Sequence, residues 1–239
     1  MDDLPMVEAL LERQGKFREL RRKLEAEDAG KLTAPSEGPW ISLSQQLGSG
    51  GTELARRLGH ELGWQVYDRE ILRVIAENTH TRESVLSQMD EKAVGPLIEY
   101  LRRLLDSSIP GQVPIMRETV SVIWSLAKQG NAVIVGRGAN WFLSPHSGVR
   151  VRTIAAREFR IAAVSREAAI DRTTAERTID EDDRRRADYI RQAHGQNIEN
   201  PEGYDLVLNL GALDLDSAQE IVLAVLRRRI ADALLQPPT

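Results

Sequence analysis

The sequence predicts an α/β protein built around a mainly parallel sheet. Short apolar segments alternate along the chain with longer amphipathic segments of helical period, which is the arrangement of βαβ units. Residues 132–135 form a continuous apolar segment, typical of a strand buried on both faces. The 239 residues, 41% of them apolar, suffice for one such domain with an appendage or for two small domains.

Composition narrows the class of protein. A formal net charge of −4 argues against nucleic-acid binding as the main role. The chain contains no cysteine, which excludes disulfides and cysteine-ligated metal and indicates a reducing compartment. Residues 1–5 lack the basic start of a signal peptide, and no apolar segment is long enough to cross a bilayer. We therefore expect a soluble, cytoplasmic protein that does not bind membranes.

The first 36 residues stand apart from the rest. Residues 4–27 carry apolar side chains at near-heptad spacing and predict one amphipathic helix. This helix either packs on its own domain or binds a partner, and a second copy of the chain is one such partner. Residues 31–39 are rich in Pro, Gly and Ser, as linkers are. We expect a boundary at residue 36 and a globular domain over residues 37–235.

A glycine-rich segment joins the first expected strand, residues 40–43, to the first expected helix. The sequence Gly-Ser-Gly-Gly at 48–51 allows a sharp turn and a close approach of the backbone to a ligand. Leucines recur every fourth residue from 54 to 62 and predict a helix that ends at Gly63. Backbone N–H groups in a strand–turn–helix of this kind bind anions, so phosphate is the expected ligand. A turn without a ligand is the alternative.

The segment matches the phosphate-loop pattern G-x-x-x-x-G-K-S/T only in part. Gly50 and Thr52 stand at the second glycine and at the hydroxyl that binds magnesium. Gln45 replaces the first glycine, and Gly51 replaces the lysine.

The alternation of strands and helices continues to the end of the chain. Asp68 follows the second expected strand, residues 64–67, and either caps the next helix or faces the phosphate site, because parallel strands end at one edge of a sheet. Further strands are expected at 132–135, 149–155 and 204–209. Helices are expected at 69–78, over most of 79–115 before a loop at 107–114, and at 117–129, 174–193 and 221–235.

Five landmarks in order resemble the cytidylate kinase-like family. They are Ile-Ser-Leu-Ser with Gly-Ser-Gly-Gly (41–51), Val-Tyr-Asp-Arg-Glu (66–70), Val-Ile-Val-Gly-Arg-Gly-Ala (133–139), Asp-x-x-Arg-Ala-x-Tyr (183–189) and Tyr-Asp-Leu-Val-Leu-Asn (204–209). The resemblance covers about residues 40–233. It implies a three-layer P-loop NTPase fold with a five-stranded parallel sheet, a helical segment that binds the nucleoside monophosphate, and a lid. It also implies phosphoryl transfer from ATP, with Mg²⁺, to a nucleoside monophosphate, with CMP or dCMP as the default acceptor.

The resemblance also assigns roles to individual residues. The donor phosphates would lie on Gly48, Ser49, Gly50, Gly51 and Thr52, with Thr52 as the magnesium ligand. The acceptor would contact Asp68, Arg117 and Arg137. Arg160, Asp183 and Arg186 would be the catalytic lid residues. Arginine suits these positions because its planar fork binds two phosphate oxygens and keeps its charge.

Four departures from true cytidylate kinases leave a second function open. Glycine stands at 51 in place of the lysine, Val135 replaces an acid, and Gly138 replaces the aspartate of Gly-Arg-Asp. The usual Ser-Arg of the first strand reads Ser44-Gln45. The alternative is a catalytically weak or inactive nucleotide-binding regulatory protein whose N-terminal helix binds a partner.

Overall fold

The strands expected from the sequence form one fully parallel sheet in the order β2-β3-β1-β4-β5. The computed structural model describes residues 38–68, 72, 113–144 and 146–235. The strands are β1 (Trp40–Gln45), β2 (Gln65–Tyr67), β3 (Ala132–Val135), β4 (Gly148–Ile154) and β5 (Leu206–Asn209). The helices are α2 (Gly51–Leu62), α6 (Val113–Gln129), α7 (Arg157–Ala168), α8 (Arg172–His194) and α9 (Leu215–Leu235), with short 3₁₀ turns η1 (Ala139–Trp141) and η2 (Pro201–Gly203).

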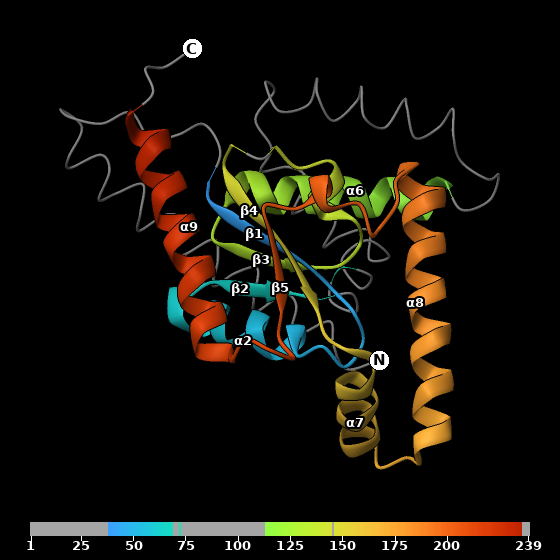
Figure 1. The fold of residues 1–239 in the computed structure, drawn as a ribbon. Coiled ribbons are helices and arrows are strands. Elements are labelled where there is room, and N and C mark those ends of the chain that lie inside the picture. Colours follow the sequence, from blue (N-terminus) through green and yellow to red (C-terminus); the bar gives the residue numbers. More distant parts are fainter. Residues whose placement is uncertain (1–37, 69–71, 73–112, 145, 236–239) are drawn as a thin grey trace, which may run out of the picture.

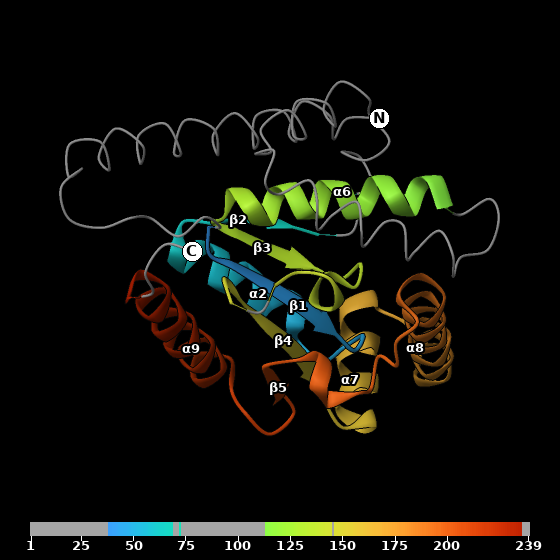
Figure 2. The ribbon, with the colours of Figure 1, turned by 90° about the horizontal axis from the view of Figure 1, so that it is seen from above.

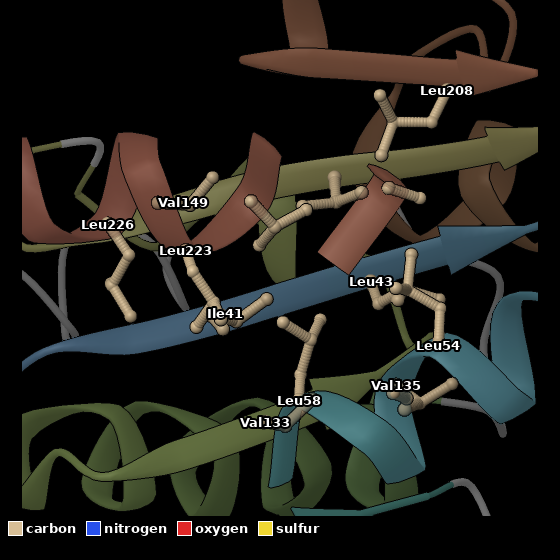
Figure 3. Packing of buried hydrophobic residues seen from close by; sticks show 14 of the residues in the cluster. Ile41, Leu43, Leu54, Leu58, Val133, Val135, Val149, Leu208, Leu223 and Leu226 are labelled. Atoms are coloured by element: carbon tan, nitrogen blue, oxygen red, sulfur yellow. The ribbon is translucent and has the colours of Figure 1, made fainter. Parts of the chain in front are cut away.

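Three layers enclose two apolar cores, because alternate residues of each strand face opposite sides of the sheet. On one face, Trp40 and Ile134 pack against α6. On the other face, Ile41 and Leu43 pack against α2 and α9 (Figures 1, 2 and 3). The predicted fold class, a three-layer α/β fold with a five-stranded parallel sheet, is confirmed.

Helices α7 and α8 form a hairpin beyond the carboxyl ends of the strands (Figure 1). Helix α7 begins three residues after the end of β4, at the sheet edge where the glycine-rich loop leaves β1. A small apolar cluster, with Ile161 and Val164 from α7 and Ala175 and Ile179 from α8, joins the two helices. The topology therefore places this hairpin beside the loop.

Several bounds differ from those expected. Helix α6 begins at Val113 rather than at residue 117, because a proline such as Pro114 fits the first turn of a helix. Helix α9 begins at Leu215 rather than at 221, after Asp214, whose carboxylate accepts from the N–H of Ser217 at 2.8 Å. Helix α7 was not anticipated. The helix expected at 4–27 lies outside the described residues, and of the helix expected at 69–78 only Leu72 is described, in helical conformation. Of the segment expected to be mostly helical at 79–115, residues 79–112 also lie outside the described part. In the described part of the chain, no helix is both long and apolar enough to cross a membrane.

Candidate functional site: a glycine-rich loop held by the α7–α8 hairpin

The loop between β1 and α2 is shaped by two glycines in the left-handed region. Gly48 has φ 77° and Gly50 has φ 89°, conformations that a side chain strains. Gly50 is the N-cap of α2, and no side chain caps that end of the helix. Because the first N–H groups of a helix have no partner within it, this end is available to an anionic ligand.

Ser49 supports the loop from inside. Its side chain is fully buried, and its hydroxyl shares a 2.9 Å hydrogen bond with the hydroxyl of Thr153 in β4. Its backbone N–H donates to the carbonyl of Gln46 at 3.1 Å. The backbone N–H and the hydroxyl of Ser49 therefore both have partners within the protein, and its expected contact with the donor phosphates stays a prediction.

Gln45, Gly51 and Thr52 form a tight group where β1 meets α2. Gln45 Nε2 lies 3.0 Å from Thr52 Oγ1 and can donate to it, or the Thr52 hydroxyl can donate to Gln45 Oε1 at 3.2 Å. Gly51 is buried, and a β-carbon there would lie 2.5 Å from Gln45 Oε1 and 2.4 Å from Thr153 Oγ1. Contacts this short force atoms to move. The space that a lysine stem at position 51 would enter is thus occupied by neighbouring side chains.

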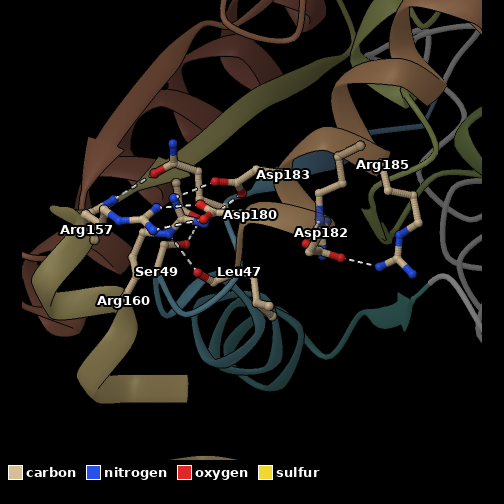
Figure 4. Close-up of polar contacts among 12 residues, drawn as sticks. Leu47, Ser49, Arg157, Arg160, Asp180, Asp182, Asp183 and Arg185 are labelled. Atoms are coloured by element: carbon tan, nitrogen blue, oxygen red, sulfur yellow. Dashed lines mark hydrogen bonds and ion pairs between the residues drawn. The ribbon is translucent and has the colours of Figure 1, made fainter. Parts of the chain in front are cut away.

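Arg160 of α7 joins the loop to α8. Its side chain is 5% exposed; Nε donates to the Leu47 carbonyl at 2.8 Å, and the two terminal nitrogens bind Asp183 at 2.7 and 2.9 Å (Figure 4). The backbone of α7 is equally close, since a β-carbon on Gly48 would lie 2.7 Å from the Arg160 carbonyl oxygen. Arg160 and Asp183, both expected to act in catalysis, therefore hold the loop against the hairpin.

A second ion pair repeats the first at one turn's distance. Arg157 binds both oxygens of Asp180, at 2.6 and 3.0 Å, three residues before the corresponding members of the Arg160–Asp183 pair (Figure 4). This second pair is half exposed at both ends. The hairpin is thus fixed by two parallel two-pronged contacts, one with a buried arginine and one open to solvent at both ends.

The opposite side of α8 carries a different cluster. Asp182 is buried and binds both Arg185 and Arg186, and in Figure 4 it points away from Asp180 and Asp183. The side chain of Arg186 is 29% exposed, against 62% for Arg185. Of the two arginines expected in the lid, Arg160 is 5% exposed and Arg186 is 29% exposed, so Arg186 has the greater freedom to reach a ligand.

Arg137 follows β3 and meets the last turns of α8. It adopts a left-handed φ of 56°, and its guanidinium lies 5.9 Å from the ring centre of Tyr189. Its Nε is buried without a hydrogen-bond partner among the described residues. Its carbonyl oxygen lies 3.2 Å from Nε2 of His194. Arg137 thus places a cation, unpaired with any carboxylate in the described part of the chain, beside α8.

His194 explains one departure from the family pattern. A β-carbon on Gly138 would lie 2.2 Å from His194 Nε2, so an aspartate at 138 has no room. The ring stacks on Phe142, and burial lowers the pKa of His194 to about 4. The imidazole is therefore neutral at pH 7, and its Nε2–H donates to the Arg137 carbonyl.

The remaining expected contacts are placed only in part. Asp68 is exposed at the carboxyl end of β2, and its carbonyl accepts from the N–H of Leu72 at 3.0 Å, as at the start of a helix. Arg117 lies in α6, but its side chain lies outside the described part of the structure.

The charge around the loop is close to balanced. Glu53, in the first turn of α2, accepts hydrogen bonds from Arg56 at 2.7 Å and Arg57 at 3.0 Å. These two arginines lower the pKa of Glu53 to about 2, so its carboxylate is ionised and offset by neighbouring positive charge.

Among the described residues, no group of three or more His, Asp or Glu side chains is arranged to hold a metal ion. Thr52, which is exposed in the first turn of α2, stands where the phosphate-loop pattern has the hydroxyl that binds magnesium.

Helix α8 connects the two groups of candidate residues. Its Asp183 binds Arg160, which in turn binds the glycine-rich loop. Its Tyr189 and His194 contact Arg137 in the loop after β3. Sequence reasoning missed the supporting roles of Thr153 and His194, which only packing defines. The one available signal was the pair of departures at Gly51 and Gly138, each of which faces a side chain from elsewhere.

Comparisons with known proteins agree with this architecture. A sequence model described as the cytidylate kinase-like family matches residues 40–212. The structure of an uncharacterized protein from Eubacterium ventriosum superposes with a TM-score of 0.64 at 22% identity, covering 79% of this chain and 98% of that one. Shikimate kinase from Bacteroides thetaiotaomicron gives a TM-score of 0.42 at 14% identity, covering 79% and 98% of the two chains. No curated protein matches the sequence.

Proposed function

Because the chain belongs to the cytidylate kinase-like family, we propose that it transfers a phosphoryl group from ATP to a nucleoside monophosphate, with Mg²⁺ as cofactor. CMP or dCMP is the acceptor that the family resemblance favours. The observation that carries the proposal is the uncapped N-terminus of α2 at Gly50, held beside an arginine-rich hairpin.

The loop fits a donor triphosphate. The left-handed glycines 48 and 50 bring the backbone to the surface without side chains, and the free N–H groups at the start of α2 would bind phosphate oxygens. Thr52 is exposed in the first turn and would be the magnesium ligand. When bound, ATP with Mg²⁺ would supply the phosphoryl group and neutralise its charge.

The acceptor would lie between the loop and the end of β3. Arg137 would bind the monophosphate, because its cation has no carboxylate partner among the described residues. Arg117 and Asp68 would complete this side, as the family resemblance implies. These residues would fix the acceptor in line with the donor, which is most of what phosphoryl transfer asks of a protein.

The hairpin would contribute positive charge in two ways. Arg160 would act as a positioning residue, since Leu47 and Asp183 already bind its guanidinium. Arg186 would leave Asp182 and approach the transferring group, because its side chain is partly exposed and paired within its own helix. Lid closure of this kind delivers charge and excludes water together.

A regulatory nucleotide-binding protein without turnover is the second candidate. The observation that favours it is the neutral loop, in which residues 45–52 contain no lysine or arginine and Gly51 has no room for one. In that case ATP would bind without phosphoryl transfer, and residues 1–36 would bind the partner.

A coupled assay of ADP release separates the two candidates. Purified full-length protein is incubated with ATP, Mg²⁺ and each common nucleoside monophosphate in turn, with an acceptor-free reaction as the blank. The kinase proposal predicts release above the blank for at least one acceptor. Binding of ATP by calorimetry with no release for any acceptor would establish the regulatory candidate instead.

A further inference from the structure

The side-chain amide of Gln45 holds the Thr52 hydroxyl. Gln45 Nε2 lies 3.0 Å from Thr52 Oγ1 and can donate to it, or the hydroxyl can donate to Oε1 at 3.2 Å. A hydroxyl has one hydrogen and two acceptor lone pairs, so at least one lone pair remains in either arrangement. An ion that reaches the exposed Thr52 can therefore meet a free lone pair of a hydroxyl whose position Gln45 fixes.

The same side chain accounts for the glycine at 51. Gln45 Oε1 would lie 2.5 Å from a β-carbon on that residue, and Gln45 Cβ would lie 2.8 Å from it. Gln45 is the last residue of β1 and alternates with Ile41 and Leu43, which face α2. The strand therefore directs the amide under the start of α2, into the volume that a lysine stem would use.

We propose that Gln45 is a positioning residue for the magnesium nucleotide. It fixes the Thr52 hydroxyl with a lone pair free for the metal, and it fills the space of the absent lysine. The inference rests on the proposed function, because only a bound nucleotide brings a metal ion to Thr52.

A neutral amide changes what ATP binding depends on. A lysine attracts phosphates by its own charge, whereas Gln45 contributes no charge. Residues 45–52 contain no lysine or arginine. The positive charge next to the phosphates then comes chiefly from Mg²⁺, held through the hydroxyl that Gln45 orients. ATP affinity should therefore depend on Mg²⁺ through the pair Gln45 and Thr52.

Calorimetry with and without Mg²⁺ tests this dependence in four full-length proteins. These are the wild type, Gln45→Met, Thr52→Val and the double variant, each titrated with ATP in Mg²⁺ and in EDTA. Methionine keeps the length of the side chain and removes the amide. Gln65→Met, at the start of β2, is the matched control, because the one partner of the Gln65 amide among the described residues is the Val66 carbonyl. Thermal melting of each protein without ligand confirms that it is folded.

We expect Gln45→Met to lose between about twofold and tenfold of the affinity gained with Mg²⁺, the worth of one hydrogen bond, while its affinity in EDTA is retained. Thr52→Val should lose the same gain, and the double variant should lose no more than Thr52→Val alone. An undiminished magnesium gain in Gln45→Met, or additive losses in the double variant, would overturn the proposal. A wild type that fails to bind ATP with Mg²⁺ would overturn the proposed function itself, before any variant is compared.

Discussion

Arg160 and Asp183 face each other across the α7–α8 hairpin. Each of the two terminal guanidinium nitrogens of Arg160 donates to one carboxylate oxygen of Asp183, at 2.7 and 2.9 Å. The third contact of this arginine, to the Leu47 carbonyl, belongs to the glycine-rich loop. A lid movement that separates the hairpin from the loop must therefore break the hydrogen bond from Arg160 to the Leu47 carbonyl, whereas the ion pair within the hairpin can stay intact. This makes the hairpin's position depend on one side chain that is 5% exposed.

The two parallel ion pairs of the hairpin provide an internal comparison. Arg160→Ala should lower the free energy of unfolding by about 2–3 kcal/mol, because it leaves the Leu47 carbonyl and Asp183 without their partner. Arg157→Ala removes the same geometry at a half-exposed site and should cost much less, since solvent screens such pairs. Denaturant unfolding of both variants is the measurement. Equal losses would show that burial of the Arg160 pair does not matter.

Burial of His194 predicts an acid-sensitive fold. The pKa of this residue lies at about 4, below the ordinary 6.5, so the folded protein binds fewer protons than the unfolded chain between these values. Stability should fall as pH decreases from about 6.5 toward 4, by about 2 kcal/mol at pH 5 relative to pH 7. His194→Gln should remove this slope in thermal or denaturant unfolding, while His146→Gln, at an exposed position, should leave it. A slope that persists in His194→Gln would contradict the account.

The strands and helices were predictable where a pattern is local. Residues 132–135 form a strand with the expected bounds, and α2 ends before Gly63 as its leucine period and glycine indicate. The contacts that define the site join residues far apart in the chain, such as Leu47 with Arg160 and Gly138 with His194. Periodicity says which face a residue occupies and not what packs against it. The glycines at 51 and 138 thus remained departures from a pattern until their neighbours were known.

Gly50 tests whether the loop binds phosphate. Its φ of 89° strains a β-branched residue, and a side chain there would occupy space next to the ligand. Gly50→Val should reduce ATP affinity at least about tenfold, the effect of losing one or two loop hydrogen bonds, while the protein stays folded. Gly63→Val is the matched control, because Gly63 has φ 64° at the other end of α2, and a β-carbon added there would have open space around it. Unchanged calorimetric affinity in Gly50→Val would make the glycine sequence only a turn.

The proposed boundary at residue 36 predicts an independent core. The Gly38 N–H donates to the Lys128 carbonyl at the end of α6 at 3.3 Å, and the Pro39 carbonyl accepts from Asn131 after that helix at 2.7 Å, so a deletion of residues 1–36 leaves these contacts intact. The shortened protein should keep a cooperative thermal transition and bind ATP. Loss of that transition would show that the segment belongs to the core. A halved solution mass by light scattering would support the proposed homodimer through this segment.

Arg186 is the candidate transition-state cation. Arg186→Ala should slow turnover by about 10²-fold or more with ATP affinity nearly intact, because the contact forms only as the group transfers. Arg185→Ala is the control, since Arg185 shares Asp182 but is 62% exposed. Turnover that is equal in the two variants, measured at saturating ATP and acceptor, would mean that this part of α8 does not reach the reaction.

The fate of the terminal phosphate of ATP tests the central claim most directly. Full-length protein is incubated with Mg²⁺, γ-labelled ATP and a nucleoside monophosphate, and the products are separated by chromatography. The account predicts that the label moves to the nucleoside diphosphate formed from at least one acceptor, CMP or dCMP first. Label that stays on ATP, or appears only as free phosphate with every acceptor, would contradict it.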